Sequence, residues 1–240
     1  MEARRIIDAA ERRDVPARLV GGLAIRLRAG DTLPARLRRD YADIDLAVLK
    51  KERARLAELL AQLGYEGNER FNAMHVERMV FYKDERHVDV FAGDFRMCHT
   101  VPLEGRIIRD PVSIPLAELL LTKLQVVALN HKDLVDIAAL LSTHDLGQED
   151  GDLINLDRVA EVCAGDWGLW RTATRTLERA EATLDGLHLD ADDRERIRTR
   201  LRELADRLER EPKSRRWRRR ALVGERVRWY SEPEEIEHAR

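Results

Sequence analysis

The sequence has few cysteines and no long apolar run. Its two cysteines, Cys98 and Cys163, lie far apart and lack the spacing of metal ligands, which argues against a disulfide scaffold and a cysteine-based zinc site. No apolar run approaches the ~18–20 residues that cross a bilayer, and the charged amphipathic start, residues 1–17, lacks the apolar core of a signal peptide. We therefore expect a cytoplasmic protein that does not contact a membrane.

An excess of one charge is also missing. The 43 basic and 45 acidic residues nearly cancel, so no global field attracts polyanions and any contact with nucleic acid must be local. The phosphate-loop pattern G-x-x-x-x-G-K-[ST] is absent, which argues against a P-loop enzyme. The histidines are scattered without the spacing of a zinc site. An apolar share of 44% is nevertheless enough to fill a core.

The pattern of apolar residues divides the chain into two parts. Helical spacing and strand-like alternation intermix up to residue 147, and everything beyond about residue 150 is helical and highly charged. We therefore predict an α/β domain at residues 1–148 and a helical domain at residues 149–240. The predicted helices are residues 3–12, 23–30, 51–64, 116–129 and 133–147, and the predicted strands are residues 15–20, 42–48, 74–82 and 87–93.

Two aspartates lie in the predicted strand "ADIDLAV", residues 42–48. Because side chains alternate along a strand, Asp43 and Asp45 project to one face, and Ile44 and Leu46 to the other. Two carboxylates on one face repel each other unless a cation lies between them, and Mg²⁺ prefers such oxygen ligands. The alternative is that both aspartates only face water on an amphipathic strand, and the pair alone does not decide between the two.

Two further features make a metal and phosphate site the favoured interpretation. Gly21 and Gly22 lie between a strand and a helix, where backbone N–H groups can approach an anion, although a tight turn explains them equally well. Asp89 lies in the strand-like run 87–93, opposite its apolar face. If this strand pairs with residues 42–48, three carboxylates converge, and such a group can hold two metal ions.

These features resemble the DNA polymerase β-like nucleotidyltransferase superfamily. Its signature is an apolar strand, Gly-Gly or Gly-Ser, a helix, Asp-x-Asp, and later a single Asp on a neighbouring strand. Within it, the sequence is most similar to small nucleotidyltransferases related to abortive-infection toxins, which often carry an Arg four residues before the first Asp, as Arg39 precedes Asp43 here. The resemblance covers roughly residues 15–142. It implies a small mixed β-sheet flanked by helices and two Mg²⁺ ions, with Mn²⁺ as an alternative, held by Asp43, Asp45 and Asp89.

The same resemblance implies nucleotide-binding roles for further residues. A family helix with an internal Lys corresponds to Lys123, and a basic-Asp-x-x-Asp-Leu helix corresponds to Asp133 and Asp136, with Lys132 and Ile137 replacing the usual Arg and Leu. The ammonium group of Lys123 lies in a strongly apolar helix and needs an anionic partner. We favour a nucleotide phosphate, and the alternative partners are Asp133 and Asp136. The full predicted nucleotide-binding set is Gly21, Gly22, Arg39, Lys123, Asp133 and Asp136.

The sequence departs from the family pattern before the acidic pair. Tyr41 replaces the family's Thr two residues before Asp43, and the interval from Gly22 to Asp43 is longer than usual. Both departures concern the nucleotide-binding role implied for Arg39 more than the metal-binding roles implied for Asp43, Asp45 and Asp89.

The reaction that the resemblance implies is transfer of a nucleoside monophosphate from an NTP such as ATP to an acceptor hydroxyl, with release of pyrophosphate. The acceptor is left open among an RNA 3′ end, a small molecule of the aminoglycoside type and a protein side chain. A non-catalytic binding module with the same fold is the alternative, and a toxin-like enzyme implies an antitoxin partner.

The basic stretch Lys213–Trp229 interleaves arginines with Trp217 and Trp229, a composition that suits RNA. An equally weighted alternative is a solvated helix face whose charge is offset by the acids of "EPEEIEH". Trp167 and Trp170, three residues apart, are expected to pack in the core.

Overall fold

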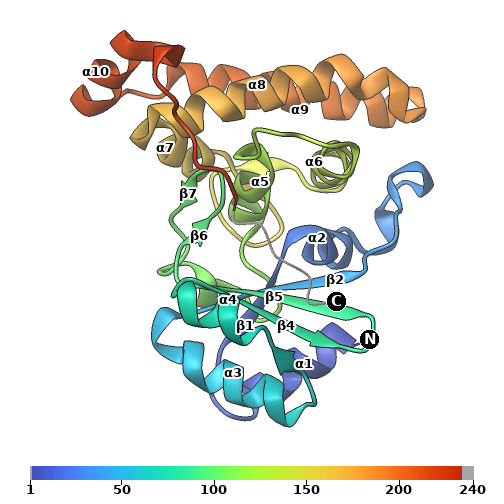
Figure 1. Ribbon diagram of the computed structural model, residues 1–240. Helices are drawn as coiled ribbons and strands as arrows, with labels where there is room; N and C mark the ends of the chain where they lie inside the picture. Colours follow the sequence, from blue (N-terminus) through green and yellow to red (C-terminus); the bar gives the residue numbers. More distant parts are fainter. Residues whose placement is uncertain (1, 234–240) are drawn as a thin grey trace.

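The computed structural model describes residues 2–233, and its centre is a five-stranded sheet of order β1-β2-β5-β4-β3 (Figure 1). Strands β2 and β5 run parallel, and the other neighbouring strands run antiparallel. The small mixed sheet flanked by helices is therefore confirmed. The strands are β1 (Ala17–Val20), β2 (Asp43–Val48), β3 (Glu66–Gly67), β4 (Arg78–Lys83) and β5 (Arg86–Ala92).

Helices cover both faces of the sheet. In Figure 1, α1 (Glu2–Glu11) and α3 (Arg53–Gln62) lie below the sheet and α2 (Gly21–Ala29) lies above it. Helix α1 forms because Ala3, Ile6, Ile7 and Ala10 recur at helical spacing and are all buried. The strand residues that face α1 and α3 are apolar except for Lys83 and Arg86 at the β4–β5 turn, so this face of the sheet contributes mainly to the core, whereas the other face carries the acidic residues.

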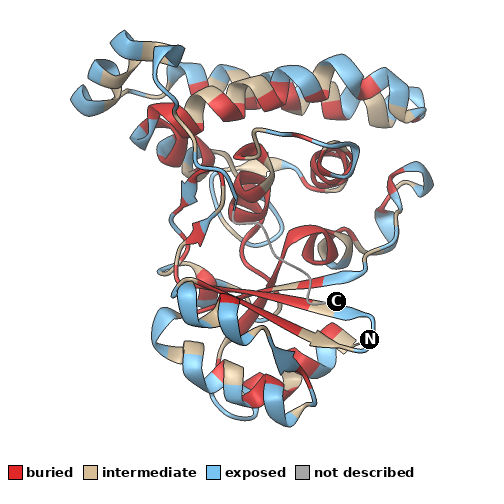
Figure 2. Ribbon diagram, viewed as in Figure 1, coloured by how far each residue is buried: buried red, intermediate tan, exposed pale blue. Residues whose placement is uncertain are grey.

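Most of the chain after the sheet stacks above α2. Helices α5 (Leu116–Leu124) and α6 (His131–Thr143) lie between the sheet and α7 (Leu156–Gly165), α8 (Trp167–Thr183) and α9 (Ala191–Arg210). Figure 2 shows buried residues throughout α5, whereas in α8 and α9 they alternate with exposed ones. The remaining elements are α4 (Glu69–Met74), β6 (Phe95–Arg96), β7 (Thr100–Val101), β8 (Leu146–Gly147), β9 (Ile154–Asn155) and α10 (Arg215–Val223).

The predicted domain boundary falls between β8 and β9, which pair in parallel across it. Buried residues on both sides belong to one continuous hydrophobic cluster, so the division into two domains stays a prediction. No helix within residues 2–233 is long and apolar enough to cross a membrane.

Several element boundaries differ from the prediction, and helix caps explain two of them. The strand expected from residue 74 begins at Arg78, because the Asn68 side chain caps α4 by accepting a hydrogen bond from the N–H of Phe71. The helix expected from residue 133 begins at His131, because Asn130 and Asp133 form a reciprocal capping box. The helix expected to reach residue 129 ends at Leu124.

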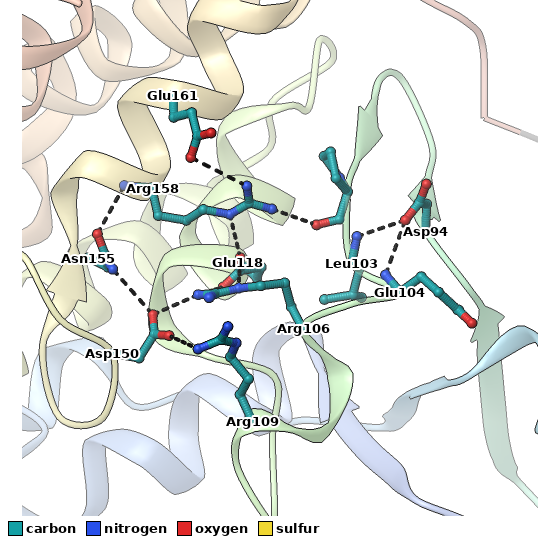
Figure 3. Close-up of polar contacts among 11 residues, drawn as sticks. Asp94, Leu103, Glu104, Arg106, Arg109, Glu118, Asp150, Asn155, Arg158 and Glu161 are labelled. Atoms are coloured by element: carbon teal, nitrogen blue, oxygen red, sulfur yellow. Dashed lines mark hydrogen bonds and ion pairs between the residues drawn. The ribbon is translucent and has the colours of Figure 1, made fainter.

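A buried carboxylate connects the segment before α5 with the helices above it. Glu118, which is fully buried in α5, accepts a hydrogen bond from Arg106 at 2.8 Å and from Arg158 of α7 at 2.9 Å (Figure 3). Arg106 also binds Asp150 at 2.6 Å, close to the predicted boundary. This network fixes α5 against α7, and α5 carries Lys123 near its other end.

Candidate functional site

The three predicted metal-binding aspartates lie on one face of the sheet. In the parallel pairing of β2 with β5, Asp45 lies opposite Asp89, and Asp43 lies opposite His87. Paired residues of neighbouring strands point to the same face, here the face under α2. The pairing on which the convergence of three carboxylates depends is therefore present.

The surroundings of Asp45 disfavour its charged form. Burial, followed by the negative charge of Asp89, raises the pKa of Asp45 from its usual 3.8 to about 7, against the opposing effect of Lys123. The Asp45 carboxylate rests against Gly21, where an added Cβ would overlap it. Gly21 also has a φ of 66°, a conformation that L side chains rarely adopt. Gly21 is thus required by the strand-to-helix turn and by the position of Asp45.

Asp89 is held by an arginine that the sequence analysis missed. Arg78 Nε donates to Asp89 Oδ1 at 2.9 Å, and Nη2 donates to Oδ2, with both residues at least 90% buried. Within residues 2–233, no group of three or more His, Cys, Asp or Glu side chains is placed to hold a metal ion. The turn between β4 and β5 pairs Lys83 with Arg86, and this register places Val80 opposite Asp89. Arg78, two residues before Val80, therefore lies on the same face as Asp89. A correct prediction of this turn would have revealed the pair.

Arg39 lies beside Gly22 and binds an aspartate rather than standing free. Its Nε and Nη2 donate to the two carboxylate oxygens of Asp136 at 2.9 and 2.8 Å, and its guanidinium lies 4.1 Å from the centre of the Tyr41 ring. A Cβ at Gly22 would overlap this guanidinium and contact the ring. The absence of a side chain at Gly22 therefore lets Arg39 pack against the first turn of α2.

Lys123 pairs with the two acids that were named as its alternative partners. Its Nζ lies 3.1 Å from Asp133 and 2.9 Å from Asp136. Burial lowers the pKa of Lys123, but the charges of Asp136 and Asp133 outweigh it and raise that pKa overall. Asp136 is fully buried and is shared by Arg39 and Lys123, so these four side chains form one neutralised cluster behind the aspartates of β2.

A cavity of about 520 Å³ opens in front of this cluster. Asp43 and Asp45 line it together with Gly22, Lys123 and Asp133, and more basic side chains line it from the segment before β2 and from the start of α6. Asp43 is the exposed member of the acidic set, with 64% of its side chain accessible. The cavity thus combines hard oxygen ligands with several cations, the chemistry that a metal-bound polyphosphate requires.

The aromatic rings of the basic C-terminal stretch are used for packing. The Trp217 and Trp170 rings pack edge to face with their centres 5.1 Å apart, and the Trp229 and Trp167 rings do so with their centres 6.1 Å apart. Trp167 is buried, as expected, and Trp170 is partly buried against the core. Most exposed side chains of α10 are arginines. The exposed residues of this helix are Arg215, Arg216, Arg218, Arg219, Leu222 and Val223. Of the acids expected to offset the basic stretch, Glu232 lies 2.6 Å from Arg228, whereas Glu234, Glu235 and Glu237 lie outside the described residues.

Comparisons with known proteins give a distant structural likeness. No protein-family model matches the chain, and no curated protein matches it significantly. The solution structure of the antibiotic-resistance factor ANT(2'')-Ia matches with 15% identity and a TM-score of 0.39, covering 86% of this chain and 92% of that one. A crystal structure of ANT(2'')-Ia in complex with adenylyl-2''-tobramycin has the same identity and TM-score, covering 83% and 94%. A functional assignment for this chain therefore rests on the geometry of its own site.

Proposed function

We propose that this chain is a metal-dependent nucleotidyltransferase that transfers a nucleoside monophosphate from an NTP to an acceptor hydroxyl. The observation that carries the proposal is the placement of Asp43, Asp45 and Asp89 on one face of two parallel strands, beside a cavity lined by cations. The raised pKa of Asp45 supports it, since a crowded carboxylate favours a bound cation as much as a proton.

Asp43 and Asp45 fit a divalent cation, for which Mg²⁺ is the first candidate and Mn²⁺ the alternative. Asp43 is exposed and Asp45 shares its face, so both offer oxygen ligands toward the cavity. Asp89 would join such a site, or complete a second one, through the lone pairs that its hydrogen bonds with Arg78 leave unused, or after Arg78 releases one of its oxygens. A bound cation would supply neutralisation of phosphate charge and activation of the acceptor hydroxyl.

In the proposed reaction, the acceptor oxygen forms a bond to the α-phosphorus while the bond from that phosphorus to its bridging oxygen breaks and pyrophosphate leaves. The hydroxyl proton passes to Asp89 or to water. Asp43 and Asp45 would hold the cation that neutralises the α-phosphate, and the cluster of Arg39, Lys123, Asp133 and Asp136 braces the wall next to Gly22. Positioning and charge neutralisation dominate such transfers.

A non-catalytic binding module is the second candidate, because the ion pair with Arg78 occupies both oxygens of Asp89. For the catalytic proposal, the exposed arginines of α10 favour an RNA 3′ end as acceptor. A small hydroxyl compound of the aminoglycoside type and a protein side chain are the other acceptors to be tested. An antitoxin partner follows only if RNA modification proves toxic.

The test measures pyrophosphate release from each NTP with Mg²⁺ and either total RNA, aminoglycosides or a protein mixture. We expect release with the wild type and loss of at least ~100-fold in Asp43→Asn and Asp45→Asn, which remove charge needed to stabilise the transferring phosphate. Asp31→Asn, at an exposed residue outside the cavity, is the matched control. Release that survives Asp45→Asn refutes the metal role, and absence of release with every acceptor favours the binding module.

A further inference from the structure

The cations at the back of the cavity are already neutralised. Arg39 and Lys123 together face Asp133 and Asp136 at 2.8–3.1 Å, and Asp136 is fully buried. Detaching Arg39 would take one of the two cations from the fully buried Asp136, and detaching Lys123 would take the other together with the cation that pairs with Asp133, and both changes are unfavourable. The polyphosphate of an NTP therefore needs other cations.

Three other cations line the same cavity. Arg36 and Arg38 come from the segment between α2 and β2, and Lys132 comes from the first turn of α6. All three are exposed, and none forms an ion pair with another residue in the described range 2–233. Arg38 Nε donates at 3.3 Å to the carbonyl of Leu33, which leaves its terminal nitrogens for a ligand. Their charge is available without breaking any internal pair.

The segment that carries the two arginines is anchored rather than loose. Leu33 and Leu37 are 1% and 0% exposed, and the 3-10 turn Ala35–Leu37 packs against α6. Arg36 and Arg38 flank the buried Leu37, so the side chain that fixes the turn also fixes their backbone. Since Lys132 belongs to α6 itself, the three cations sit on connected supports, a preorganised arrangement that lowers the entropy cost of binding.

We propose that Arg36, Arg38 and Lys132 bind the β- and γ-phosphates of the NTP, which become the pyrophosphate product. This inference rests on the proposed function, in which the α-phosphate lies beside Asp43 and Asp45. It assigns the long interval before Asp43 a binding role, with Arg36 and Arg38 contacting the substrate directly. It also assigns Arg39 and Lys123 a supporting role behind the phosphates, in place of direct phosphate contact.

The experiment measures binding of Mg²⁺-tripolyphosphate to the whole protein by calorimetry, which needs neither an acceptor nor a known base. In the variant Arg36→Gln/Arg38→Gln/Lys132→Gln, we expect Kd to rise by at least ~10-fold, since each charge-assisted contact typically contributes more than a neutral one. The control Arg215→Gln/Arg218→Gln/Arg219→Gln removes the same charge from α10 and should change Kd by less than roughly twofold. Thermal melting of each variant checks folding, and Arg36→Gln alone serves if the triple variant melts early.

Equal weakening in both triple variants, unchanged binding in the cavity variant, or no binding by the wild type would each overturn the inference. Failure of the proposed function is separate from all of these. It is decided by pyrophosphate release, which can be absent while the three cations still bind tripolyphosphate. In the converse case, nucleotide transfer depends on Asp45, but the triple variant of Arg36, Arg38 and Lys132 binds tripolyphosphate as well as the wild type. That result would reject the phosphate-binding role of the three cations and leave the proposed function intact.

Discussion

The substitution Asp45→Asn should stabilise the metal-free protein at neutral and higher pH. The folded state raises the pKa of Asp45 from 3.8 to about 7, chiefly by burial and by the charge of Asp89. An unfolded chain loses this proton near its usual pKa, so between about pH 4 and 7 the folded state binds more protons and its stability falls as pH rises. The loss of stability caused by ionising Asp45 in the folded protein is therefore absent below about pH 4 and complete above about pH 7.

Each pKa unit corresponds to about 1.4 kcal/mol, so the penalty reaches at most about 4 kcal/mol, and relaxation around a half-buried group reduces it to about 2 kcal/mol. Asparagine has nearly the same shape and carries no charge, so it removes most of this penalty. In a chain of this length we expect Tm at pH 8 with chelator to rise by about 4–8 °C in Asp45→Asn. The two proteins should melt within a degree or so of each other at pH 4.

The measurement is thermal unfolding from pH 4 to pH 8 in the presence of chelator, repeated with Mg²⁺. Bound cation replaces the proton as the neutralising charge, so Mg²⁺ should raise the Tm of the wild type more than that of Asp45→Asn. Asp31→Asn, exposed and outside the cavity, serves as the control and should not show this pH pattern. If Asp45→Asn is less stable than the wild type at pH 8, or if its gain persists at pH 4, the electrostatic reasoning is refuted.

Three further substitutions, with Arg109→Gln as a control for the first, test the supports of the site by denaturant unfolding. Glu118→Gln should lower the free energy of unfolding by about 2–4 kcal/mol, because Arg106 and Arg158 lose a fully buried charged partner. Arg109→Gln, at the exposed edge of the same network, should lower it by less than ~0.5 kcal/mol. Leu37→Ala should cost about 2–3 kcal/mol and weaken tripolyphosphate binding, since it removes the anchor of the arginine-bearing turn. Asn130→Ala should cost about 1 kcal/mol through loss of the α6 cap.

Alternation along two strands was enough to predict the acidic face. Residues 42–48 and 87–93 each have one apolar face, and both faces become buried only when the strands lie side by side above the same helices. The sequence did not determine the partner of Lys123, because a nucleotide phosphate and two aspartates could each pair with its ammonium group. The choice depended on how α6 packs against α5. This packing brings Asp133 and Asp136, one helical turn apart, to 3.1 and 2.9 Å from the Lys123 ammonium group.

The segment between Gly22 and Asp43 was the least predictable part. Beyond the predicted helix 23–30 it has no helical or strand period, and its position depends on the turn Ala35–Leu37 packing against α6, which lies about a hundred residues away in sequence. The role of Arg78 was hidden for a related reason. A shift of one residue in the hairpin register would have placed Arg78 on the opposite face from Asp89, so alternation alone left its partner undetermined.

The pairing of Arg78 with Asp89 has a consequence for how metal and nucleotide bind. If Asp89 turned toward a metal while no nucleotide was present, the buried guanidinium of Arg78 would lose its hydrogen bonds to this carboxylate. A substrate phosphate that reached Arg78 would replace those hydrogen bonds. Metal binding at Asp89 and substrate binding at Arg78 should therefore favour each other, and linkage makes this preference reciprocal. On this argument, substrate binding should favour Asp89 as a third carboxylate ligand beside Asp43 and Asp45.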